Sequence, residues 1–128
     1  MNHKEYLLLA GRPNSGKTEI MIHYANQYPL TTLFISEEYA PNTLYRRGLS
    51  NHVRVIGSES LNNVKFNNYK TICIDYLQLF EKDIIQTLLK KLAQMDVRII
   101  LASSVHQNTQ IDNLFKTPQI NKSTNHGR

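Results

Sequence analysis

The sequence predicts a three-layer α/β fold in which a mainly parallel sheet lies between helices. Short apolar runs alternate along the chain with segments of helical periodicity, as in parallel strands joined by right-handed crossovers. Polar side chains follow several of these runs directly, as they do where ligands bind beyond the carboxyl ends of parallel strands. A chain of 128 residues is long enough for one such sheet with its helices.

The first half of the chain contains two predicted strands and two predicted helices. The apolar run 6–10 predicts a buried first strand, and residues 18–27 carry apolar side chains at helical spacing. Residues 31–36 are β-branched and aromatic and predict the second strand. Pro41 begins a short helix that we expect to end at about Leu49.

The second half continues the alternation. Residues 53–56 predict a short edge strand, and residues 57–68 a polar, mostly irregular segment with one helical turn at most. The run 71–75 predicts a buried strand that ends in an acid, and residues 97–102 predict another apolar strand. Between them, residues 82–95 predict an amphipathic helix. Its apolar face consists of Ile84, Ile85, Leu88, Leu89 and Leu92.

One domain over residues 1–107 is expected, followed by a polar tail, 108–128, that has little to bury and is expected to be partly disordered. The single cysteine, Cys73, excludes a disulfide framework and a cysteine zinc cluster, and its apolar surroundings predict a buried thiol. No secretion signal and no run of about 18 apolar residues is present. A soluble, cytoplasmic protein with no membrane partner is therefore expected.

The formal net charge of +5 favours an acidic partner such as nucleic acid, although a basic surface can equally serve solubility. Two basic pairs, Arg46-Arg47 and Lys90-Lys91, lie on predicted helices. A solvated helix face is the usual explanation for such pairs, and contact with nucleic acid is the alternative.

The most specific local signal is an eight-residue segment that fits the phosphate-loop pattern G-x-x-x-x-G-K-[ST]. It consists of Gly11, Arg12, Pro13, Asn14, Ser15, Gly16, Lys17 and Thr18. Because it lies between a predicted strand and a predicted helix, backbone N–H groups and the helix N-terminus can surround a polyphosphate. Lys17 is predicted to reach the β- and γ-phosphates of ATP, and the Thr18 hydroxyl to hold Mg²⁺.

Acidic residues follow two of the predicted strands. Asp75 is placed to bind Mg²⁺ through water, with an ordinary strand-end carboxylate as the alternative. Glu38 is the candidate for orienting the attacking water, which is the kind of positioning that phosphoryl transfer needs. Glu37 is one residue away, and alternation along a strand predicts that only one of the two faces the nucleotide. After the last strand, Gln107 is predicted to contact the nucleotide, with a satisfied loop as the alternative.

These motifs resemble the RecA-like ATPase core of DnaB-type replicative helicases. The phosphate loop, residues 10–18, is similar to that family's A-R-P-S-x-G-K-T form. Residues 35–39 resemble its F-S-L-E-M segment, which implies that Glu38 is the catalytic glutamate. Residues 74–79 match its I-D-Y-L-Q-L Walker B segment.

The resemblance extends from residue 6 to about residue 107. Leu44 and Arg47 fall where the family has L-x-x-R, and residues 89–103 are similar to its following helix and strand. The resemblance implies a RecA-like P-loop NTPase fold in which the strand 97–102 lies between the phosphate-loop strand and the Walker B strand.

Two departures from the family lower the expected rate of hydrolysis. The family's sensor glutamine falls on Ser104, whereas Gln107 lies three residues later. Beyond Arg98 the next arginine is Arg128, so the family's basic finger has no clear counterpart. An arginine finger contributes about 10³–10⁵ in rate, and slow intrinsic hydrolysis is therefore expected. The resemblance also does not cover the family's N-terminal primase-interacting domain.

The leading interpretation is a small Mg²⁺-dependent ATPase acting in DNA replication or recombination, of a size that suits a virus or mobile element. Its candidate partners are single-stranded DNA, a second copy of the chain and a replication protein. The second interpretation is a nucleotide-binding interaction module that regulates a replication partner without hydrolysing ATP. The third is a nucleoside or nucleotide kinase, which shares the Asp75-x-x-Gln78 spacing but has zinc cysteines and an arginine-rich lid that this sequence lacks.

Overall fold

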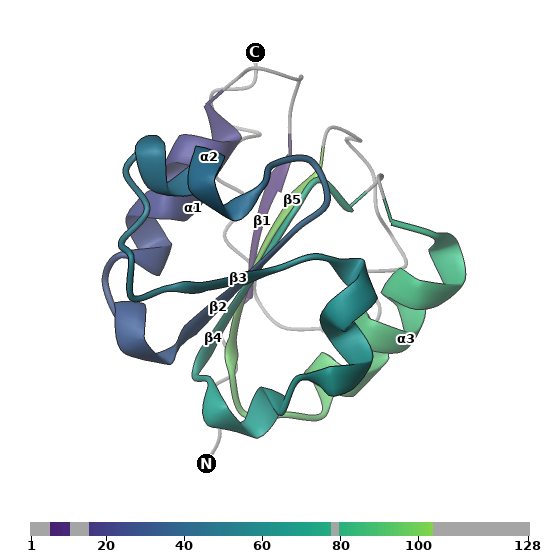
Figure 1. Ribbon diagram of the computed structural model, residues 1–128. Helices are drawn as coiled ribbons and strands as arrows, with labels where there is room; N and C mark the ends of the chain where they lie inside the picture. The colour runs from purple at the N-terminus through teal and green to yellow at the C-terminus, as the bar shows by residue number, and fades with distance from the viewer. Residues whose placement is uncertain (1–5, 11–15, 78–79, 104–128) are drawn as a thin grey trace.

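The computed structural model describes residues 6–10, 16–77 and 80–103, and these form an α/β fold. A five-stranded sheet runs through the centre, and every pair of neighbouring strands is parallel. Helical segments cover both faces of the sheet, so the arrangement has three layers (Figure 1). The predicted fold class is confirmed.

The strand order in the sheet is β1-β5-β4-β2-β3. The strands are β1 Tyr6–Ala10, β2 Thr32–Ser36, β3 Arg54–Ile56, β4 Thr71–Asp75 and β5 Arg98–Ser103. β5 thus lies between β1 and β4, as the resemblance implied, and β3 lies at an edge, as its length predicted. The register aligns Ala10 with Ser103 and Ser36 with Asp75. The carboxyl ends of four strands therefore meet at one edge of the sheet.

The helices divide between the two faces (Figure 1). α1, Lys17–Ala25, and α2, Pro41–Arg46, pack on one face. The other face carries α3, Lys82–Ala93, and the 3-10 helices η2, Ser58–Asn63, and η3, Phe66–Asn68. A further 3-10 helix, Pro29–Thr31, leads into β2. The polar segment 57–68 therefore contains more helical structure than the one turn predicted for it.

Alternation along the strands divides the core into two apolar clusters. Leu7 and Leu9 of β1 pack on the α1 side with Met21, whereas Leu8 packs on the α3 side with Leu92. Cys73 of β4 is fully buried on the α1 side, as its apolar run predicted. Because both faces of the sheet are covered, the central strands appear in the sequence as continuous apolar runs.

α2 ends earlier than predicted, at Arg46 instead of about Leu49. Gly48 has φ 112°, a left-handed conformation, and its N–H donates to the carbonyl of Tyr45 at 3.1 Å. The N–H of Leu49 donates to the carbonyl of Leu44 at 3.1 Å. These two bonds form a Schellman motif, which ends a helix where glycine can adopt positive φ.

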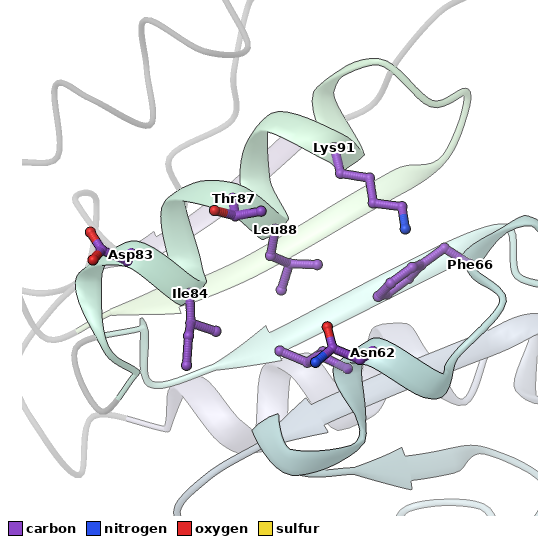
Figure 2. Close-up of a pocket in the computed structure, with 8 residues that line it drawn as sticks. Asn62, Phe66, Asp83, Ile84, Thr87, Leu88 and Lys91 are labelled. Atoms are coloured by element: carbon purple, nitrogen blue, oxygen red, sulfur yellow. The ribbon is translucent and has the colours of Figure 1, made fainter.

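The apolar face of α3 is buried in its C-terminal half, at Leu88, Leu89 and Leu92, whereas Ile84 is 37% exposed. Ile84 lies at a cavity of about 340 Å³ between α3 and the two 3-10 helices. Figure 2 shows this cavity, in which Lys91 approaches Phe66. The Lys91 Nζ is 5.0 Å from the centroid of the Phe66 ring. The cavity is lined by Leu61, Asn62, Phe66, Asp83, Ile84, Thr87, Leu88 and Lys91.

In the part of the chain that the structure describes, no helix combines the length and the apolar character needed to cross a membrane. The predicted tail, residues 108–128, lies outside the described residues.

Candidate functional site

α1 begins directly after Gly16, the last glycine of the segment that was predicted to be a phosphate loop. Gly16 precedes the helix with φ 86°, a left-handed conformation that glycine adopts without strain. Its carbonyl accepts the N–H of Ile20 at 3.1 Å, which closes the first helical turn. Lys17 and Thr18 follow as the first residues of α1, and both are buried. The polar groups of these two residues therefore sit where the helix N-terminus favours negative charge.

Thr18 and Asp75 form a hydrogen-bonded pair between the first turn of α1 and the end of β4. The Thr18 hydroxyl donates to Oδ2 of Asp75 at 3.1 Å. Asp75 is fully buried, and its Oδ1 has no hydrogen-bond partner among the described residues. A buried carboxylate oxygen without a partner is costly, so this atom is available to a ligand that brings positive charge or a donor.

The electrostatics of the site are governed by burial. Burial raises the pKa of Asp75 to about 6, and the charge of Glu38 also raises it, whereas the Thr18 hydrogen bond, Arg47 and Lys17 lower it. Burial lowers the pKa of Lys17 and the charge of Asp75 opposes this change. Each group therefore lies within electrostatic reach of Asp75, and a positive ligand would stabilise the ionised carboxylate.

Mg²⁺ fits the pair formed by Thr18 and Asp75. It prefers hard oxygen ligands, and it is commonly bound through one or two carboxylates together with phosphates and waters. Here a hydroxyl oxygen and a carboxylate oxygen lie 3.1 Å apart, and the second carboxylate oxygen has no partner among the described residues. Within residues 6–10, 16–77 and 80–103, no group of three or more His, Cys, Asp and Glu side chains is arranged to hold a metal.

The two glutamates after β2 have different surroundings. Glu37 accepts the backbone N–H of Ser58 through Oε2 at 2.6 Å. The charge of Glu38 raises the pKa of both Asp75 and Tyr76, so it lies on the side of the buried carboxylate. Both glutamates are exposed and line a pocket of about 300 Å³. Which of the two glutamates acts on a ligand stays a prediction.

Two tyrosines beside these acids were not singled out by the sequence reasoning. Tyr76 directly follows Asp75 and has φ 54°, the one positive value among the described non-glycine residues. Its ring and that of Tyr39 meet edge to face, with centroids 6.4 Å apart. A non-glycine residue in the left-handed region costs about 1–3 kcal/mol, and such strain is concentrated at functional sites. The sequence signal for Tyr76 was the Tyr of the I-D-Y-L-Q-L segment, whereas Tyr39 falls where the F-S-L-E-M segment has Met.

The basic pair at the end of α2 is exposed at both positions, Arg46 in the last turn and Arg47 at the C-cap. Arg47 also forms an ion pair with Glu19, and its guanidinium lies 4.6 Å from the centroid of the Tyr39 ring. The interpretation of the pair as a solvated face, with nucleic-acid contact as the alternative, stays a prediction.

Several predicted site residues lie outside the described residues. They are Gly11, Arg12, Pro13, Asn14, Ser15, Gln78, Ser104 and Gln107.

At the carboxyl edge of the sheet, the Thr18 hydroxyl is hydrogen-bonded to Asp75, and the charges of Lys17 and Glu38 act on the pKa of that carboxylate. These groups can neutralise a polyphosphate, hold a hard cation and accept a proton from water. No protein-family model matches this chain, and no curated protein matches it.

Proposed function

We propose that the chain is a small Mg²⁺-dependent ATPase with a RecA-like core of the DnaB type, acting in DNA replication or recombination. The observation that carries the proposal is the hydrogen bond between Thr18 and Asp75, at 3.1 Å. It joins the residue after the phosphate-loop lysine to an acid at the end of a neighbouring strand. In phosphate-loop NTPases, magnesium is held by a Ser or Thr after the loop lysine and by an acid at the end of another strand.

Each residue has one role in this proposal. Lys17 binds the β- and γ-phosphates through its ammonium group, and Thr18 and Asp75 hold Mg²⁺. When bound, Mg²⁺ neutralises charge on the phosphate oxygens. Glu38 orients a water molecule and accepts its proton as the water oxygen bonds to the γ-phosphorus and ADP departs.

The sheet order supports the same proposal. β5 lies between β1 and β4, which is the arrangement that the resemblance implies for a RecA-like core. The register brings Ala10, Asp75 and Ser103 to the same edge, where ligands bind in open parallel sheets. Single-stranded DNA, a second copy of the chain or a replication protein is the proposed partner, because the net charge of +5 favours an acidic partner.

A nucleotide-gated interaction module is the second candidate function. The sequence favours it at Ser104, which stands where the family has its sensor glutamine. In this case ATP is bound by the same Lys17, Thr18 and Asp75, and turnover is absent until a partner supplies the missing group. A nucleoside or nucleotide kinase is disfavoured, because the arginine-rich lid of that class has no counterpart in the sequence.

The test combines ATP binding with phosphate release, each measured with and without single-stranded DNA. Binding is followed by the Mg²⁺-ATP-dependent rise in unfolding free energy, about 2.7 kcal/mol at 100 times Kd. Lys17→Ala is expected to abolish binding or turnover while the fold survives. Glu38→Gln is expected to keep binding and lose turnover, and Glu37→Gln is the matched control.

Each result has a distinct meaning. DNA-stimulated phosphate release that Glu38→Gln abolishes supports the ATPase. ATP binding with no release under either condition supports the interaction module. Equal ATP binding by wild type and Lys17→Ala contradicts both, and loss of turnover in Glu37→Gln alone transfers the catalytic role to Glu37.

A further inference from the structure

Arg47 connects two segments that are far apart in the sequence. It is the C-cap residue of α2, and its guanidinium forms an ion pair with Glu19 in the first turn of α1. The same guanidinium lies 4.6 Å from the centroid of the Tyr39 ring, in the segment that follows β2. Arg47 therefore bridges the helix that begins at Lys17 and the segment that carries Glu38.

Tyr39 is fixed by more than its contact with Arg47. Its backbone N–H donates to Oγ of Ser36 at 3.1 Å, and its ring meets the ring of Tyr76 edge to face. On the other side of Glu38, the Glu37 carboxylate accepts the N–H of Ser58 at 2.6 Å. Both chain neighbours of Glu38 are thus anchored, which limits the positions that its exposed carboxylate can take.

The charges agree with this geometry. Hydrogen bonds to Glu19 and then to Tyr39 raise the pKa of Arg47, so the cation is stabilised in this place. The charge of Arg47 also lowers the pKa of Asp75. The guanidinium therefore lies within electrostatic reach of the Thr18–Asp75 pair. An exposed ion pair by itself adds little to global stability, so its expected effect is local order.

We propose that Arg47 is a positioning residue that holds Tyr39, and with it the Glu38 segment, against the first turn of α1. The position of Glu38 is then tied to the helix that carries Lys17 and Thr18. The ordering of residues 36–40 is a claim about the chain itself, whereas its effect on turnover rests on the proposed ATPase function.

The first test measures backbone amide exchange over residues 36–40 in the free protein. Arg47→Ala is expected to increase exchange at Tyr39 at least fivefold, because the Tyr39 ring loses its cation. Arg47→Lys keeps a cation near Glu19 and Tyr39 and is expected to recover part of the protection. Arg46→Ala is the matched control, since Arg46 is a neighbouring exposed arginine on the same helix. Equal exchange in Arg47→Ala and Arg46→Ala overturns the proposal.

The second test separates turnover from binding. Arg47→Ala is expected to lower kcat about tenfold or more and to change the Kd for ATP less than threefold. Tyr39→Ala is expected to have the same effect, and the double variant to be no slower than either single one, because both changes remove one contact. A loss confined to ATP affinity, or additive losses in kcat, contradicts a positioning role.

The two tests distinguish failure of the proposed function from failure of the positioning role of Arg47. If wild type and Lys17→Ala bind ATP equally, the proposed function fails, and amide exchange still decides whether Arg47 orders residues 36–40. If ATP is bound and hydrolysed but Arg47→Ala turns over like Arg46→Ala, the proposed function stands and the positioning role fails.

Discussion

Thr18 donates a hydrogen bond to one carboxylate oxygen of Asp75, and the other oxygen is buried without a partner among the described residues. The carboxylate is therefore buried away from water, and only one of its two oxygens has a hydrogen-bond partner among the described residues. Such a group lowers folding stability. Under the proposed function, Asp75 is retained as a ligand of Mg²⁺ at a cost in stability.

Asp75→Asn should stabilise the protein in the absence of divalent cations. The change removes a buried charge whose pKa is raised to about 6, and the free energy of unfolding at pH 7 is expected to rise by about 1–3 kcal/mol. Urea denaturation measures this change. The same variant is expected to lose the additional stabilisation by Mg²⁺-ATP.

Asp96→Asn is the matched control, because Asp96 is exposed and its replacement should change the unfolding free energy by about 0.5 kcal/mol or less. A clear loss of stability in Asp75→Asn without cations would contradict the view that ionised Asp75 is under-satisfied in the free protein.

The stability of the free protein should depend on pH through Asp75. Its pKa rises from 3.8 to about 6 on folding, so between these values the native state keeps a proton that the unfolded state has released. The contribution of Asp75 to unfolding free energy therefore falls as pH increases from about 4 to about 6, and is constant above that range. The stability gap between Asp75→Asn and wild type should widen over this interval by about 3 kcal/mol at most. A gap that is independent of pH would show that Asp75 titrates normally.

Gly48→Ala should destabilise the end of α2. Gly48 has φ 112°, a conformation in which a side chain is strained even though no atom lies within 4 Å of an added Cβ. The expected loss of unfolding free energy is about 1–2 kcal/mol. Thermal or urea unfolding measures it, with Arg46→Ala as a helical control that should change little. A neutral Gly48→Ala would mean that the chain ends this helix in another way.

Leu92→Ala and Ile84→Ala should differ strongly, although both residues belong to the predicted apolar face of α3. Leu92 is fully buried, whereas Ile84 is 37% exposed. Removing the Leu92 side chain is expected to cost about 2–5 kcal/mol, and removing that of Ile84 less than about 1 kcal/mol. Denaturant titration of both variants is the measurement. Comparable losses would indicate that Ile84 is covered in solution.

The sequence predicted β1 and β4 to the residue, because strands buried on both faces are continuous apolar runs. It also predicted that Asp75 is the last residue of its strand. The end of α2 was predicted wrongly. The residue types at 47–49 allow a longer helix, but the positive φ of Gly48 ends it.

The contacts of Arg47 were beyond sequence reasoning for a different reason. Glu19 lies 28 residues before Arg47, and no local pattern links a residue in the first turn of one helix to the cap of another. The left-handed backbone of Tyr76 could not be predicted from the sequence either, because tyrosine has no local preference for positive φ. Both features depend on how the elements pack, which only the folded structure provides.

The place of β1 in the sheet also bears on how the protein is made. Among the described strands β1 pairs only with β5, the last of them in the chain. Among the described strands, β1 is thus synthesised first and gains its sheet partner last. A nascent chain that has not yet reached Ser103 lacks that partner, so β1 should join the sheet late in synthesis, after β2, β3 and β4 are already available.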